Sequence, residues 1–123
     1  MRNFVLVLVT FALLIGAGCA SRGEKVLANC KTDYEKVRKC ELFAKMYLNP
    51  RGPIAQNAGS LCLDVCDKAS QQVPNNPFPA FWHGRINLHN GNKKEACNSF
   101  KVAYDRGLTS AFLMYCNEDG SPK

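Results

Sequence analysis

Residues 96–111 read ACNSFKVAYDRGLTSA, and the spacing of apolar side chains in this stretch decides the fold. Ala96, Phe100 and Ala103 recur at i, i+4 and i+7, a spacing that places all three on one face of a helix. Gly107 follows this pattern and ends the helix, since glycine is the usual residue just past a helix C-terminus. The stretch therefore predicts a helix, a tight turn and the start of a further helix.

Outward from this stretch, the chain predicts helices and no strand. Thr32 and Glu35 have the spacing of a capping box, in which two side chains bind backbone N–H groups at a helix start. Clusters of proline, glycine and asparagine at 49–53 and 74–77 separate further helices. No segment alternates apolar and polar residues strictly, as a half-buried strand would. The result is an all-α fold of antiparallel neighbours, with helices at about 33–48, 55–73, 79–90, 93–106 and 109–116.

An internal repeat links two of these helices. Cys62, Cys66 and Ala69 are followed 34 residues later by Ala96, Phe100 and Ala103. This period is that of tetratricopeptide repeats, and residues 33–115 resemble such an array; the run from Ala96 to Ala111 also resembles the Sel-type variant of exported cysteine-rich proteins. The resemblance implies a right-handed array of about five helices at 32–117, stapled by disulfides.

The resemblance also implies a partner-binding surface. The first helix of each tetratricopeptide repeat lines the inner face of the array, which here corresponds to Phe78, Phe81, Arg85 and His89. Phe81, Arg85 and His89 follow one another at i, i+4 and i+8, along one stripe of their helix. Aromatic residues beside arginine are typical of interface hot spots. The alternative is that Phe78, Phe81 and Trp82 belong to the core.

The first 18 residues have the order of a secretory signal peptide. Arg2 precedes an apolar run at 4–15, and the small residues at 16–18 provide a cleavage site. The apolar run is shorter than the roughly 20 residues that span a bilayer, so we expect the segment to be removed. Residues 19–31 then form the mature N-terminus and a polar tether, and residues 118–123 a polar tail.

Gly16-Ala17-Gly18-Cys19 resembles the lipobox of bacterial lipoproteins, although leucine is usual where Gly16 stands. The resemblance implies that Cys19 is lipidated and becomes the new N-terminus. Because Ala20 is not aspartate, it also implies sorting to the outer membrane, facing the periplasm. The alternative is ordinary cleavage after Ala20, which would release an unanchored secreted protein.

The six cysteines beyond Cys19 are an even number in an exported chain, which indicates a disulfide framework. Cys97 and Cys116 lie ten residues before and nine after the turn at Gly107, so an antiparallel hairpin brings them together. The remaining four are Cys30, Cys40, Cys62 and Cys66.

Cys40 and Cys62 lie eleven residues on either side of Arg51, and the same argument pairs them. Cys30 is then left for Cys66, one helical turn beyond Cys62. The alternative is that some of these cysteines are buried free thiols.

The sequence gives little support for metal binding, catalysis or nucleic-acid binding. Cys62 and Cys66 share a helix face as zinc ligands can, but His83 and His89, six residues apart, point to different sides of their helix. The chain carries no nucleophile elbow, phosphate loop or nucleic-acid motif. We therefore expect no metal, no cofactor, no catalytic residue, no nucleic-acid partner and no identified small-molecule substrate.

These patterns together predict a cell-envelope lipoprotein whose helical domain binds another envelope protein, as an assembly or pilot factor would. The net charge is +6, or +5 once Arg2 is removed, and the basic residues are scattered singly or in pairs, as is typical of a solvated surface. The alternative is that they attract anionic lipid or an acidic partner. The rival hypotheses are a secreted helical effector or inhibitor and, with less support, a thiol- or metal-dependent enzyme.

Overall fold

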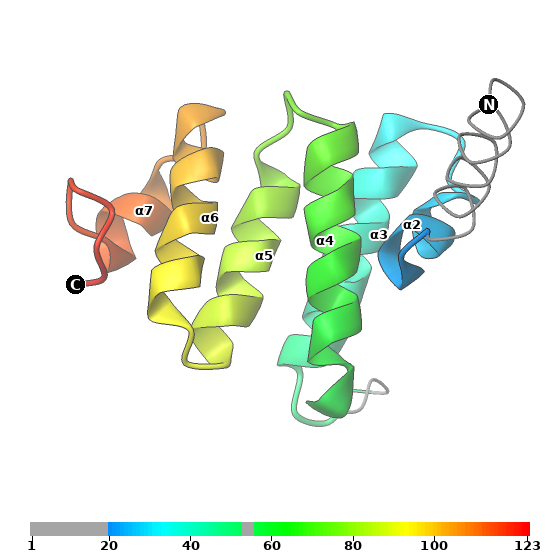
Figure 1. Cartoon of the computed structure of the whole chain (residues 1–123), viewed down its shortest axis with the longest axis horizontal. Helices are drawn as coiled ribbons and strands as arrows, with labels where there is room; N and C mark the ends of the chain where they lie inside the picture. The colour runs from blue at the N-terminus through cyan, green and yellow to red at the C-terminus, as the bar shows by residue number, and fades with distance from the viewer. Residues whose placement is uncertain (1–19, 53–55) are drawn as a thin grey trace, which may run out of the picture.

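The computed structural model describes residues 20–52 and 56–123. Figure 1 shows these residues as a row of helices, with α2 at one end of the long axis and α7 at the other. The described residues contain no β-strand, which confirms the all-α prediction. The signal peptide (1–18), the lipidation of Cys19 and the expected helix start near residue 55 lie outside the described residues. The elements are α2 (Arg22–Leu27), α3 (Asp33–Leu48), the 3-10 turn η1 (Gln56–Ala58), α4 (Gly59–Gln72), α5 (Phe78–His89), α6 (Lys93–Asp105) and α7 (Ser110–Tyr115).

Each helix packs against its neighbour in the chain from α3 to α7, and α3 also packs against α5. The helices follow one another in the predicted order, and their boundaries differ from the expected ones by only a few residues. The specific geometry of a tetratricopeptide array remains a prediction.

Helix α2 lies within residues 19–31, where the sequence predicts a polar tether, and it corrects that prediction. Ser21 caps the helix by accepting a hydrogen bond from the Glu24 N–H at 3.2 Å, and Leu27 is buried in the core. The N–H of Gly23 donates to the Asp64 carboxylate of α4 at 2.6 Å, and a Cβ on Gly23 would lie 2.7 Å from the Asp64 backbone. Such a short helix carries too few apolar residues for periodicity to reveal it, and its packing on α4 stabilises it.

Helix α3 begins as the sequence predicts. The Thr32 side chain accepts a hydrogen bond from the Glu35 N–H at 3.1 Å. The Glu35 carboxylate reaches back to the Lys31 N–H at 2.9 Å, one residue before the position that a capping box uses. Two donors at the helix N-terminus are satisfied in this way.

The α3–α4 hairpin contains a Cys40–Cys66 disulfide, which corrects both the Cys40–Cys62 and the Cys30–Cys66 predictions. The prediction centred the turn on Arg51, but α3 ends at Leu48 and α4 begins at Gly59, so the centre lies near residue 53. This shift moves the partner of Cys40 by one helical turn. Cys62 instead lies beside Phe43, with its sulfur 3.6 Å from that carbonyl oxygen.

The turns after α5 and α6 have the same construction. Gly91 and Gly107 have φ values of 82° and 107°, in the left-handed region that favours glycine. The next N–H in each case bonds back to the helix, from Asn92 to the Asn87 carbonyl and from Leu108 to the Ala103 carbonyl, both at 2.9 Å. These bonds form Schellman motifs, which satisfy the last carbonyls of each helix.

The second hairpin places Cys97 beside Cys116, and the predicted disulfide between them is present. Residues 118–123, expected to be a polar tail, fold back on α7 together with Asn117. The Lys123 N–H donates to the Tyr115 carbonyl at 3.0 Å and the Asn117 N–H to the Ser121 carbonyl at 2.8 Å. A short bridge between Cys116 and Pro122 completes this C-terminal turn.

The core divides into two clusters along the row of helices. One gathers α2, α3, α4 and Ile86 around the Cys40–Cys66 disulfide. The other gathers α6 and α7 around Phe100 and the second disulfide. Gly84 allows α5 and α6 to approach closely, because a Cβ at this position would lie 2.5 Å from the Phe100 ring.

Candidate partner-binding groove

A groove of about 530 Å³ lies between α3 and α5. We call it the α3/α5 groove. Its apolar lining comes from α3, the end of α4 and α5, and comprises Tyr34, Val37, Val73, Phe78, Phe81 and Trp82. Its polar lining comprises Asp33, Arg38, Glu41 and Asn76.

Two of the four aromatic side chains that line the groove are strongly exposed. Tyr34 is 74% exposed and Phe78 is 46% exposed. Phe81 and Trp82 are half-buried, and their rings meet edge to face with centroids 5.0 Å apart. Phe81 also contacts the core, with its ring centroid 6.3 Å from that of Phe100. The groove therefore presents an apolar surface, and the contact between Phe81 and Phe100 ties this surface to the core.

The segment that begins α5 is held by hydrogen bonds. The Asn76 side chain accepts from the Phe78 N–H at 2.9 Å. The Arg106 guanidinium of α6 donates to the Asn76 carbonyl at 3.2 Å and to the Ser70 hydroxyl at 2.9 Å. These bonds fix the α4–α5 turn, and with it the position of Phe78.

Two cations lie over the aromatic rings of the groove. The Arg85 guanidinium is 5.7 Å from the Phe81 ring centroid and 6.0 Å from that of Trp82. The Lys45 ammonium is 5.7 Å from the Trp82 centroid. Arg85 is exposed and forms no ion pair with any described residue. Its charge is therefore available to an anionic group of a bound molecule.

The charges along α3 are balanced by contrast. Glu41 pairs with Lys45 and with Arg38, each at 2.8 Å. Hydrogen bonds from Lys45 and Arg38 lower the pKa of the Glu41 carboxyl, and the hydrogen bond to Glu41 raises the pKa of Arg38. Such exposed pairs contribute little to stability, but they leave Arg85 as the unpaired cation of this surface.

The structure brings together three of the four residues predicted to bind a partner. Phe78 and Phe81 line the groove, and Arg85 joins them through its contact with Phe81. His89 lies apart, with its ring edge-on to Tyr47 at a centroid distance of 5.7 Å. The i, i+4, i+8 stripe rotates around the helix by about 40° per step, which carries His89 out of the groove.

Sequence reasoning missed the contribution of α3. Tyr34 and Val37 form the wall that faces Phe78 and Phe81. In the predicted repeat, α3 would be the first helix of its hairpin, as α5 would be of the next. Applying the inner-face argument to both helices would have identified Tyr34.

A polar cluster connects α5 to α6 behind the groove. His83 Nδ1 lies 2.7 Å from the Ser99 hydroxyl and 3.2 Å from the Asn87 amide. Burial lowers the pKa of His83. Asn87, which is 4% exposed, also donates to the His83 carbonyl at 3.2 Å. These contacts satisfy the polar atoms of His83 and Asn87 between α5 and α6.

Cys30 and Cys62 are free thiols. Cys62 is fully buried, and burial raises the pKa of its thiol. Cys30 is half-buried at the turn before α3. In the described part of the chain, no group of three or more histidine, cysteine or acidic residues lies close enough to hold a metal ion.

Comparison with protein-family models, with curated proteins and with solved structures finds no match to this chain. Among the described residues, no helix is long and apolar enough to cross a membrane.

Proposed function

We propose that this protein is a cell-envelope lipoprotein whose helical domain binds a segment of another envelope protein in the α3/α5 groove. The observation that carries the proposal is the exposed aromatic surface of the groove beside the unpaired Arg85. Aromatic and arginine side chains are enriched at interface hot spots.

The charges suggest the chemistry of the bound segment. The Arg85 guanidinium can bind a carboxylate, and the neighbouring rings of Phe81 and Trp82 can pack against an apolar side chain next to it. Asp33, at the start of α3, carries the opposite charge to Arg85, so the bound segment has a preferred direction. A peptide with an apolar anchor and an adjacent acidic residue fits this arrangement best.

The architecture supports the adaptor role. Helices α3 and α5 lie against each other, and each begins a helix hairpin. The Cys40–Cys66 disulfide holds the α3–α4 hairpin, and the Cys97–Cys116 disulfide joins α6 to the end of α7. A tetratricopeptide-like array would use the α3 and α5 faces to bind its ligand, and the Gly16 to Cys19 segment would anchor it.

Site-specific photocrosslinking tests this function in intact envelopes. A crosslinking residue at Tyr34 should yield one discrete adduct with an envelope protein, because Tyr34 is exposed in the groove. Leu113 on α7, which is 56% exposed and outside the groove, provides the matched control. The same set of adducts from both positions, or none from Tyr34, would contradict the proposal.

A further inference from the structure

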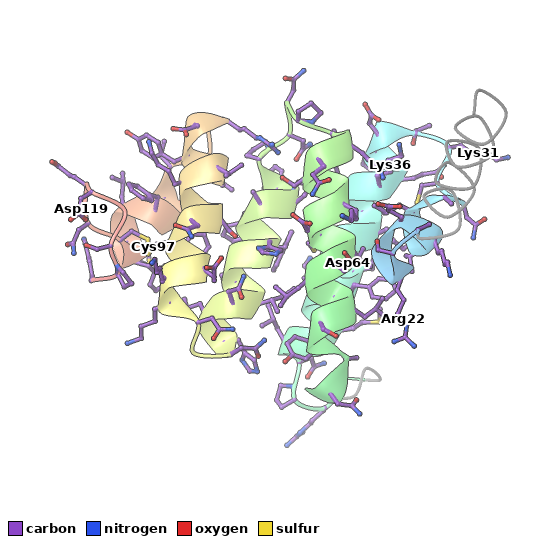
Figure 2. The ribbon with its side chains drawn as sticks, in the orientation of Figure 1. Arg22, Lys31, Lys36, Asp64, Cys97 and Asp119 are labelled. Carbon is purple, nitrogen blue, oxygen red and sulfur yellow. A yellow bond between two sulfur atoms is a disulfide. The ribbon has the colours of Figure 1, made fainter. Side chains whose placement is uncertain are left out.

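The end of the molecule that carries α2 is rich in basic side chains. Residues 20–39 contain six basic residues and three acidic ones, whereas residues 40–123 contain nine and seven. Figure 2 shows Arg22, Lys31 and Lys36 on the half of the molecule that carries α2. Residues 20–39 therefore carry a net charge of +3, against +2 for the much longer remainder of the mature chain.

One of these six basic side chains, Arg38, pairs with Glu41, and the other five have no acidic partner within the described structure. Arg22, Lys25, Lys31, Lys36 and Lys39 form no ion pair with any described residue.

The nearby acidic groups are already engaged. Glu24 faces Lys68 at 3.8 Å. Asp64 accepts from the Gly23 N–H, and Glu35 accepts from the Lys31 N–H. Asp33 lies in the α3/α5 groove.

The point where the chain enters the domain lies on the same surface. Ala20, Lys25 and Lys36 border one hollow of about 400 Å³ beside α2. Helix α2 begins right after Ser21 and is fixed to α4 by Leu27 and by the Gly23–Asp64 hydrogen bond. Ala20, the first described residue, therefore lies at this basic surface.

We propose that the basic end formed by α2 and the start of α3 docks on an anionic lipid leaflet. The inference rests on the proposed lipidation of Cys19, which would place that residue among the headgroups. The headgroup region of one leaflet is about 5–8 Å thick, so the basic end meets it directly. Each lysine near an anionic surface strengthens the attraction about fivefold.

Docking in this way sets the orientation of the domain. Helices α2 and α7 lie at opposite ends of the long axis (Figure 1), so α7 would be the element farthest from the leaflet. The leaflet would then fix the direction in which the domain extends, which a flexible tether would not do.

Lysine labelling of the lipidated protein in vesicles tests the proposal. The full mature protein, purified in detergent, is placed in vesicles of phosphatidylcholine alone or with a third phosphatidylglycerol. An amine-reactive reagent and mass spectrometry then report each lysine. We expect Lys25, Lys31 and Lys36 to react at least fivefold more slowly in the anionic vesicles, with Lys93, Lys94 and Lys101 unchanged. Salt at 1 M should remove the difference, since it shortens the Debye length to about 3 Å.

A charge variant and its control sharpen the test. Lys25→Glu with Lys36→Glu should restore most of the Lys31 reactivity in anionic vesicles, whereas Lys93→Glu with Lys94→Glu should not. Equal labelling of Lys31 in both kinds of vesicle would overturn the docking proposal. Protection in intact envelopes but not in vesicles would also overturn it and would assign the surface to a protein partner.

The same digest separates this proposal from the function on which it rests. The mass of the N-terminal peptide reports whether Cys19 is acylated. An acylated Cys19 with unprotected lysines would refute the docking and leave the anchor intact. An unmodified N-terminus would refute the anchor and the docking together, and would not affect the test of the groove.

Discussion

His83 links the stability of the protein to pH. Its ring is held between Ser99 and Asn87, and burial lowers its pKa below the ordinary value of 6.5. The unfolded chain therefore binds a proton at higher pH than the folded chain does. Protonation favours unfolding under these conditions.

We predict that the contribution of His83 to the free energy of unfolding does not change with pH above about pH 6.5. Below that pH, the free energy of unfolding should decrease as the pH falls through the folded-state pKa of His83. The measurement is chemical denaturation at pH 7.5 and pH 5 for the wild type and for His83→Gln. The wild type should lose more free energy of unfolding between the two pH values than the variant. An equal loss would show that His83 is not responsible.

Arg85 and Gly84 show how neighbouring positions serve different purposes. Gly84 faces α6, where its missing side chain makes room for the Phe100 ring. Arg85 is exposed and covers the rings of Phe81 and Trp82. One residue thus sets the spacing of two helices, and the next provides charge to the groove.

At the scale of helices, the two hairpins illustrate what sequence reasoning can provide. The α6–α7 turn is short and marked by Gly107, so its centre was evident and the Cys97–Cys116 pair was predicted. The α3–α4 connection includes the η1 turn, which delays the start of α4. A delay of a few residues changes which cysteine faces Cys40, and no local signal in the sequence reports it.

Helix α2 and the α3/α5 groove could not be predicted from the sequence for a related reason. Helix α2 is only six residues long and is stabilised by α4 through Asp64 and the buried Leu27. The groove forms because α3 lies against α5. Tertiary contacts determine both features, whereas the four longer helices, α3 to α6, follow from local periodicity and breakers.

The corrected pairing makes a prediction for thiol chemistry. Non-reducing peptide mapping should link Cys40 to Cys66 and Cys97 to Cys116. Cys30 should react with a thiol reagent in the native protein, and Cys62 only after unfolding, because Cys62 is buried and its thiol pKa is raised. Loss of either disulfide should cost about 2–4 kcal/mol.

Two results would contradict this prediction. A Cys40–Cys62 peptide would mean that the α3–α4 register is wrong by one helical turn. Fast labelling of Cys62 in the native state would mean that the contact between α3 and α4 opens readily.

At the scale of the whole molecule, the row of helices separates two surfaces. The basic end near α2 would face an anionic leaflet, and the α3/α5 groove would face a protein partner. The disulfides lie in separate core clusters, one near each end of the row. This arrangement suits a small anchored protein that holds a binding groove in a fixed position near a membrane.

The most direct test of this account is capture of the groove partner by Arg85→Ala. We use Lys101→Ala as the matched control, because Lys101 also lies over aromatic rings, 4.9 Å from the Tyr104 centroid and 5.6 Å from that of Phe112, but outside the groove. Arg85 is exposed, so neither variant should change the melting temperature appreciably.

Quantitative mass spectrometry of proteins captured from solubilised envelopes gives the result. The account predicts that the protein crosslinked at Tyr34 is captured by the wild type and by Lys101→Ala, and about thirtyfold less by Arg85→Ala, as expected for a hot spot of about 2 kcal/mol. Equal capture of that protein by all three would contradict the claim that the groove binds a partner.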